Sequence, residues 1–316
     1  MMLVNQKEKS YELIDSGEGM KLERFGQHTL VRPDPEALWP KKLDKTVWEK
    51  ADATYLRKGA SGSWTKAKTF PAKWNISYGG LTFELRPTSF KHVGLFPEQK
   101  SHWEWMENKL KAESVKSKAG PIRVLNLFAY TGGATLSAAK AGAEVTHVDS
   151  SKVAIDWARK NAELSGLSEK PIRWIEDDVL KFLRREVKRG NHYDAIVMDP
   201  PAFGHGTGGS LWKIERDFYE LFTLVEQVLS EDAFALIVNG YTAGYSPITL
   251  ENNLKNILEI RGGVIEHGEL ALSEEKNNRA QAEQSSHDGN RAQAEQSSHD
   301  GRLLPAGVYA RWSINS

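Results

Sequence analysis

The stretch VLNLFAYTGGATLSAAKAGAEVTHVD, residues 124–149, decides the fold that this sequence predicts. It begins with an apolar run, continues through a glycine-containing turn and a helical run of small residues, and ends in a second apolar run closed by an acid. This order is typical of a parallel β-α-β unit buried on both faces. Ligands bind beyond the carboxyl ends of such strands. Gly132 and Gly133 fall at that edge, where the absence of Cβ lets the backbone approach a ligand.

Asp149 indicates the kind of ligand, because an acid at the end of the second strand can accept hydrogen bonds from both hydroxyls of an adenosine ribose. NAD and S-adenosylmethionine (SAM) both carry that ribose. A dinucleotide fingerprint needs G-x-G-x-x-G to hold a pyrophosphate, but YTGGAT, residues 130–135, has two adjacent glycines and no third. The turn therefore favours SAM, which has no phosphate, over a dinucleotide or a sheet without a ligand.

Downstream of Asp149, apolar runs of strand length alternate with helical patterns as far as residue 260. Strict alternation predicts a doubly wound α/β sheet with right-handed crossovers. Residues 263–272 and 307–314 are two further strands with no helix between them, so they should pair as an antiparallel hairpin. The predicted fold is a Rossmann-like seven-stranded sheet with a terminal antiparallel hairpin, the architecture of class I SAM-dependent methyltransferases.

The rest of the chain divides by composition. Residues 1–92 contain short strand-like runs separated by Gly and Pro, which predicts a small β-rich substrate-recognition domain. Residues 93–120 predict a connecting helix, with Pro97 in its first turn, and a linker. Residues 121–316 form the predicted methyltransferase domain. Four tryptophans of the first segment could stack on bases, although a core role is commoner in a small β module: Trp39, Trp48, Trp64 and Trp74.

The unit NRAQAEQSSHDG at residues 278–289 recurs unchanged at 290–301. It has no apolar residue larger than Ala, so it cannot bury enough surface to fold. We expect residues 273–302 to be a disordered, duplicated loop. A metal site within it is a minor alternative, with four candidate ligands: His287, Asp288, His299 and Asp300.

Composition excludes several classes of protein. The 316 residues contain no cysteine, so disulfides, Cys-ligated zinc and a catalytic thiolate are excluded. No stretch approaches the apolar length of a membrane span, and we expect a cytoplasmic protein.

Residues 1–120 carry 21 Lys and Arg against 15 Asp and Glu, whereas the whole chain has 42 of each. A basic first part suits a polyanion such as RNA, or is an ordinary soluble surface.

Acids follow three of the predicted parallel strands. Asp149 is placed for the ribose, Asp178 for the adenine amino group, and Asp199 opens the segment D-P-P-A-F. Two consecutive prolines stiffen this turn and remove N–H donors. The turn therefore presents acceptors, the Asp199 carboxylate and the Pro200 carbonyl, which suit a substrate N–H. Phe203 could stack on a base brought out of its helix.

These motifs support a resemblance to a known family. The runs NLFAYTGG, VDSSKVAIDWARKNAELSGL, DDVLKFLRREVKRG and YDAIVMDPPAFG resemble the large-subunit ribosomal RNA methyltransferase group of class I SAM-dependent enzymes. The front segment DSGEGMKLERFGQHTLVRPDPEALW, with GLFPEQKSHWEWM, is similar to a bacterial branch of that group. The resemblance implies RNA as the substrate. It implies SAM binding by Phe128, Tyr130, Thr131, Gly132, Gly133, Asp149 and Asp178, and an active-site role for Asp199, Pro200, Pro201 and Phe203.

One departure from the family changes the expected product. Its cytosine-C5 members carry a cysteine after the fifth strand, because carbon 5 becomes nucleophilic only after a thiolate adds to carbon 6. Residues 238–243 read VNGYTA here. We therefore expect methylation of a base nitrogen, which needs no enzyme nucleophile. The alternatives are ribose 2′-O transfer with Lys213 as base, methylation of a protein side chain or small molecule, and a SAM-binding module without catalysis.

Overall fold

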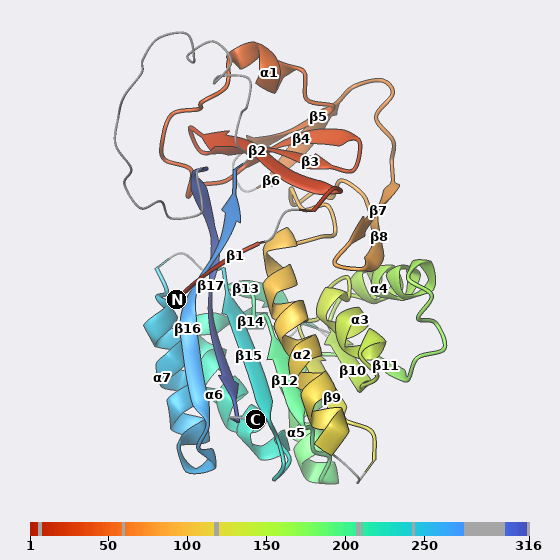
Figure 1. Ribbon diagram of the computed structural model, residues 1–316, viewed down its shortest axis with the longest axis vertical. Helices are drawn as coiled ribbons and strands as arrows, with labels where there is room; N and C mark the ends of the chain where they lie inside the picture. The colour runs from red at the N-terminus through yellow and green to blue at the C-terminus, as the bar shows by residue number, and fades with distance from the viewer. Residues whose placement is uncertain are drawn as a thin grey trace, which may run out of the picture.

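The computed structural model describes residues 1–5, 8–58, 61–116, 120–206, 209, 211–241, 244–274 and 301–314 (Figure 1). Both copies of the twelve-residue unit, apart from the last residue of the second, and the four candidate metal ligands within them lie outside this part of the chain. Among the described residues, none of the helices is both long enough and apolar enough to cross a membrane.

The larger sheet has eight strands in the order β1-β16-β17-β15-β12-β9-β10-β11. Neighbouring strands are parallel except at β17, which runs antiparallel to β15 and β16. The strands are β1 (Met2–Val4), β9 (Arg123–Leu127), β10 (Glu144–Asp149), β11 (Ile172–Glu176), β12 (Ala195–Met198), β15 (Ala235–Gly240), β16 (Val264–Ser273) and β17 (Leu303–Ser313). This arrangement confirms the Rossmann-like sheet and its terminal hairpin. The eighth strand, β1, was not predicted, because three residues carry no usable periodicity.

Helices cover both faces of this sheet (Figure 1). They are α2 (Lys100–Lys116), α3 (Gly133–Lys140), α4 (Lys152–Leu164), α5 (Val179–Arg189), α6 (Ile214–Val228) and α7 (Pro247–Leu258), which continues into the 3-10 turn η3 (Glu259–Arg261). On β12, Ile196 and Met198 pack in the cluster with α5, α6 and α7, whereas Ala195 and Val197 pack with α2 and α3. The near-continuous apolar runs of the central strands follow from this two-sided burial.

The strand order places the ligand crevice. From β9 the chain continues outward to β10 and β11, and it then returns to β12 on the other side of β9. In an open parallel sheet, ligands bind outside the carboxyl ends of the strands at such a switch point. Phe128 directly follows β9 and Asp199 directly follows β12, so the order of the strands brings these two residues together.

The N-terminal part forms a five-stranded sheet in the order β2-β3-β4-β5-β6. Its elements are β2 (Tyr11–Gly17), β3 (Met20–Phe25), β4 (His28–Pro33), α1 (Lys45–Glu49), β5 (Ala53–Lys58) and β6 (Ser61–Lys66). A separate hairpin of β7 (Trp74–Tyr78) and β8 (Leu81–Leu85) turns at Gly79 and Gly80 and packs against α4. After it, the 3-10 turn η1 (Pro97–Gln99) leads into α2, within the segment in which a connecting helix is expected.

The N-terminal tryptophans belong to the core of this region. Each indole N–H donates to an acceptor within the protein. Trp48 is buried, and the other three are partly buried against the neighbouring core. These contacts favour packing over stacking on bases.

The β16–β17 hairpin connects the two sheets. Beyond the large sheet, Glu274 forms an isolated parallel bridge with Leu13 of β2, and its backbone N–H donates to the Arg302 carbonyl at 2.9 Å. The Arg302 guanidinium lies 2.7 Å from the Asp15 carboxylate and 3.0 Å from that of Glu274. The ends of the segment predicted to be disordered are therefore bonded to the rest of the protein, while residues 275–300 lie outside the described part.

Arg302→Ala should lower the free energy of unfolding by about 2–4 kcal/mol, because removing one partner of a buried ion pair leaves carboxylates that water cannot reach. The Asp15 and Glu274 side chains are 0% and 1% exposed. Urea titration measures the change. Lys45→Ala is the control, since its pair with Glu49 is on the surface and should contribute about 0.5 kcal/mol or less. Equal losses in the two variants would contradict this role of Arg302.

Candidate functional site

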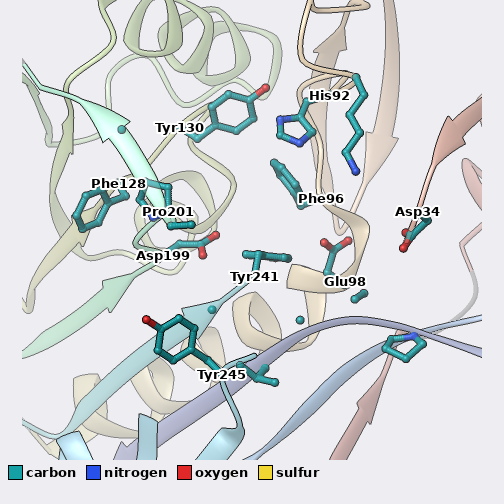
Figure 2. Close-up of a pocket in the computed structure, with 18 of the residues that line it drawn as sticks. Asp34, His92, Phe96, Glu98, Phe128, Tyr130, Asp199, Pro201, Tyr241 and Tyr245 are labelled. Atoms are coloured by element: carbon teal, nitrogen blue, oxygen red, sulfur yellow. The ribbon is translucent and has the colours of Figure 1, made fainter. Parts of the chain in front are cut away.

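A cavity of about 720 Å³ lies at the carboxyl ends of β9, β10 and β12, between the large sheet and the N-terminal sheet (Figure 2). It brings together six of the residues predicted from sequence: Phe128, Tyr130, Asp149, Asp178, Asp199 and Pro201. Five other predicted residues do not line it: Thr131, Gly132, Gly133, Pro200 and Phe203. The reasons differ from residue to residue.

The turn after β9 has an unusual backbone. Phe128 and Tyr130 have φ angles of 55° and 48°, in the left-handed region that bulky residues rarely adopt. Such strain persists only where the surroundings hold it, and it concentrates at functional sites. Here Thr131 Oγ1 donates to the Gly94 carbonyl at 2.7 Å, and the buried Asn161 amide donates to the Thr131 carbonyl at 2.9 Å. Thr131 therefore holds the turn from behind and does not face the cavity.

The two glycines fit the start of α3 to its neighbours. Gly132 is the N-cap residue, with φ of 88°. A Cβ on Gly133 would lie 2.2 Å from the Trp103 ring of α2. Their absent side chains allow close packing of α3, and only the backbone of this turn remains available to a ligand.

Asp149 is built into the same turn. Its two carboxylate oxygens accept from the backbone N–H groups of Tyr130 and Ser151, each at 2.8 Å. Burial raises the pKa of Asp149, and these N–H groups oppose that rise by stabilising the anion. Each oxygen keeps a further lone pair for a ligand. Its placement at the end of β10 fits the predicted ribose contact.

Asp178 has a structural task as well as a place in the cavity. It is the N-cap of α5 and accepts from the Lys181 backbone N–H at 3.0 Å. The neighbouring Asp177 pairs with Arg185 and does not line the cavity. Between the two adjacent acids, the structure therefore places Asp178 at the site.

Asp199 is an acid of the site whose pKa is strongly raised. Its Oδ1 is buried without a hydrogen-bond partner, in a side chain directed into the cavity (Figure 2). Burial raises the pKa of Asp199 to about 7, and the negative charge of Glu98 adds to the rise. A carboxyl group that titrates near neutrality inside a cleft is a candidate for catalysis.

The D-P-P-A-F turn differs in detail from its predicted geometry. The Pro201 carbonyl accepts from the Trp212 indole at 2.6 Å, and the Trp212 and Phe128 ring centroids are 5.0 Å apart. Pro200 is buried beneath the turn. Phe203 lies in the short hairpin of β13 (Phe203–His205) and β14 (Leu211–Lys213), with 51% of its surface exposed. Phe203 does not line the cavity, and its stacking on a base stays a prediction.

Sequence reasoning missed residues that packing between the sheets brings to the cavity: His92, Phe96, Glu98, Tyr241 and Tyr245 (Figure 2). The signal available was an isolated acid, Glu98, within the apolar segment VGLFPEQ. Burial, with the nearby cations of Arg32 and Lys91, lowers the pKa of His92 to about 3, so this imidazole is neutral. Lys213, the candidate base for ribose transfer, is exposed and does not line the cavity.

The sheet order, with β17 antiparallel between β15 and β16, and the acid that ends β10 define a class I SAM-dependent methyltransferase. Residues 53–247 match the model of the S-adenosylmethionine-dependent methyltransferase family. The chain belongs to this family, and its cofactor is SAM. A crystal structure of a SAM-dependent methyltransferase from Agrobacterium tumefaciens is 38% identical, with a TM-score of 0.88 over 100% of this chain and 94% of that one.

Two curated relatives match a smaller share of this chain. Ribosomal RNA large subunit methyltransferase I of Aeromonas salmonicida is 43% identical over 127 residues, 40% of this chain and 32% of that protein. Ribosomal RNA large subunit methyltransferase K of Neisseria meningitidis is 31% identical over 167 residues, 52% of this chain and 45% of that protein. The chain thus spans less than half the length of either. A solved structure from Streptococcus mutans, 16% identical with a TM-score of 0.67 over 97% of this chain and 76% of that one, shows a shared fold.

Asp149→Asn should weaken SAM binding about 10- to 100-fold, because a charged acceptor for ligand hydroxyls is lost and the turn loses two bonds to an anion. Calorimetric titration with SAM measures the affinity. Asp156→Asn is the matched control, since Asp156 is on the exposed face of α4 and pairs with Lys152. An unchanged affinity in Asp149→Asn would remove this residue from the cofactor site.

Asp199→Asn should stabilise the protein at pH 8, by on the order of 1–3 kcal/mol. The folded pKa is about 7, above the ordinary 3.8, so the folded state binds the proton more tightly. The destabilisation by Asp199 is therefore absent below pH 3.8, grows between pH 3.8 and 7, and is complete above pH 7. Thermal unfolding of the wild type and the variant at pH 5 and pH 8 tests this. A difference that does not grow with pH would contradict a raised pKa.

Proposed function

We propose that this protein methylates a base nitrogen of RNA, ribosomal RNA in particular, without a covalent cysteine intermediate. The observation that carries the proposal is the Asp199 carboxylate: its Oδ1 is buried and unpartnered at the wall of the cavity. An acceptor without a donor suits a substrate N–H. A nitrogen lone pair needs no enzyme nucleophile, and the chain has no cysteine.

Tyr241 supports the absence of a covalent step. It follows β15 and lines the cavity, in the segment where the cytosine-C5 members of the family carry their cysteine. Burial raises the pKa of Tyr241 well above its usual range. The neutral phenol is a hydrogen-bond donor and a poor nucleophile.

The cavity fits SAM in size and in chemistry. Its volume lies within the range of small-molecule sites, about 300–1,000 Å³. We assign SAM binding to Phe128, Tyr130, Asp149 and Asp178, which line the cavity. Thr131, Gly132 and Gly133 support this site by fixing the turn. SAM supplies an electrophilic methyl group on a cationic sulfur, and the carboxylates around the cavity favour that charge. We assign the acceptor side to Asp199 and Pro201, with Pro200 stiffening the turn and Phe203 beside it on the exterior.

The charges of the lining support a base as the part of RNA that enters. Seven carboxylates and three basic side chains line the cavity. Two of the three basic side chains already form ion pairs, Lys21 with Asp34 at 3.1 Å and Arg32 with Glu23 at 2.7 Å. Phosphates are repelled by such a lining, whereas a neutral base extruded from its stack can enter. The names of the curated relatives support ribosomal RNA as the substrate, and we accordingly propose that the protein acts in the cytoplasm.

The same acidic lining favours one alternative, methylation of a cationic protein side chain. A lysine or arginine side chain would be attracted to the seven carboxylates. The substrate assay below separates this alternative from RNA methylation.

Purified protein and tritiated SAM should label the RNA fraction of large ribosomal subunits from a strain that lacks the gene. Asp199→Asn should bind SAM normally and lose transfer by roughly 100-fold or more, because the charged acceptor for the reacting N–H is gone. Asp232→Asn, an exposed residue in the turn before β15, is the control and should be fully active.

Nucleoside analysis of the labelled RNA then identifies the methylated atom. Label confined to ribosomal protein would favour the alternative acceptor. A 5-methylcytosine product, or full activity of Asp199→Asn, would contradict the proposed mechanism.

A further inference from the structure

Glu98 is a second carboxylate of the cavity whose role the SAM site does not explain. It lies in η1 and is 7% exposed, although glutamate side chains are rarely buried unless they are paired. Burial raises its pKa, while the Lys21 and Arg32 cations of the N-terminal sheet act in the opposite direction and Glu23 adds to the rise. Figure 2 shows the Glu98 and Asp199 carboxylates on either side of Tyr241, both at the cavity. They are close enough for the charge of Glu98 to raise the pKa of Asp199.

Hydrogen bonds of Gln99 fix the position of η1, the turn that carries Glu98. Asn239 Nδ2 donates to Gln99 Oε1 at 3.2 Å, and Gln99 Nε2 donates to the Tyr241 hydroxyl at 2.6 Å. These bonds join Gln99, which follows Glu98 in η1, to Asn239 of β15 and to Tyr241 directly after it. They fix η1, and with it Glu98, against the end of β15. The carboxylate of Glu98 offers lone pairs to a substrate there.

An aromatic wall lies next to this carboxylate. Phe96 is partly exposed at the cavity, and its ring centroid is 5.7 Å from those of both Tyr130 and Tyr241. It therefore stands between the strained turn after β9 and the end of β15. A planar acceptor in contact with Phe96 would have Glu98 at its edge, since the two residues are separated only by Pro97.

We propose that Glu98 binds the methyl acceptor directly, and that Glu98 and Asp199 together accept the two N–H bonds of one primary amino group on the acceptor base. This inference rests on the proposed function and narrows its substrate from any base nitrogen to an exocyclic amine. With one hydrogen held by each carboxylate, the nitrogen lone pair is left for the methyl group.

The transfer balances with these two acids. The nitrogen lone pair forms the new N–C bond, and the S–C bond of SAM breaks with its electron pair remaining on sulfur. The cationic secondary amine then loses one N–H proton to a carboxylate of the pair, from which it passes to water. The product retains one N–H for two acceptors. It therefore binds less tightly than the substrate, and a monomethylated amine is the expected end product.

Glu98→Gln is the direct test, in the tritium assay on large-subunit RNA from the deletion strain. It keeps the shape of the side chain but places an N–H donor where an acceptor is needed. We expect kcat/KM for RNA to fall roughly 10- to 100-fold, with SAM affinity within about twofold of the wild type. Glu231→Gln, exposed in the turn before β15, should have wild-type activity. Tyr241→Phe removes only the hydroxyl that accepts from Gln99 Nε2 and should lose less than Glu98→Gln does, mainly in kcat.

Wild-type kcat/KM in Glu98→Gln would overturn this inference and leave the proposed function intact. Nucleoside analysis of the wild-type product gives an independent test that does not depend on any variant folding. A base methylated on a ring nitrogen would also overturn the inference, whereas a monomethylated exocyclic amine supports it. Absence of label in RNA would instead overturn the proposed function itself.

Discussion

The buried amide of Asn161 connects the two halves of the site. Its Oδ1 accepts from the Glu84 N–H of β8 at 2.9 Å, and its Nδ2 donates to the Thr131 carbonyl at 2.9 Å. One side chain of α4 thus fixes both the β7–β8 hairpin and the strained turn that follows β9. The Trp157 indole, one turn earlier on α4, donates to the Glu84 carbonyl at 2.7 Å and reinforces the attachment. The segment that carries Phe96 and Glu98 follows this hairpin after residues 86–95, and the Gly94 carbonyl at its start accepts from Thr131 Oγ1 of the same turn at 2.7 Å.

The buried charges of the molecule fall into two kinds. Asp15 and Glu274 are fully buried, but Arg302 and several hydrogen-bond donors satisfy them, which is the usual condition for charge inside a protein. Asp199 and Glu98 are different. Burial raises the pKa of both carboxyl groups, and neither has a cation bonded to it among the described contacts. A buried acid without a bonded cation reduces stability, and proteins retain such groups where activity requires them. This contrast supports the proposed roles of Asp199 and Glu98 without reference to motifs.

Much of the fold could be predicted because its signals are local. The apolar runs of β9, β12 and β15 and the spacing of Phe218, Leu221, Phe222 and Val225 on α6 each specify an element from neighbouring residues. The acids at strand ends were predictable for the same reason, since parallel strands share one edge. Glu98 was not predictable as a site residue, because its place depends on how the N-terminal sheet packs against the large one. The left-handed conformations of Phe128 and Tyr130 were also not predictable from sequence, since neither side chain favours a positive φ.

The hydrogen bond between Glu274 and Arg302, at the end of the β16–β17 hairpin, has a consequence for the evolution of the gene. The Glu274 N–H meets the Arg302 carbonyl at 2.9 Å, and Arg302 is bonded in turn to Asp15 of the N-terminal sheet. Because both ends of this loop are fixed, a change in its length destabilises the fold little. Doubling the length adds only about 0.6 kcal/mol to the entropic cost of closing the loop. The exact tandem copy of twelve residues lies in this interval. Replication slippage could thus lengthen the gene here while the encoded catalytic sheet stays intact, which makes this hairpin a suitable position for a peptide tag or an inserted domain.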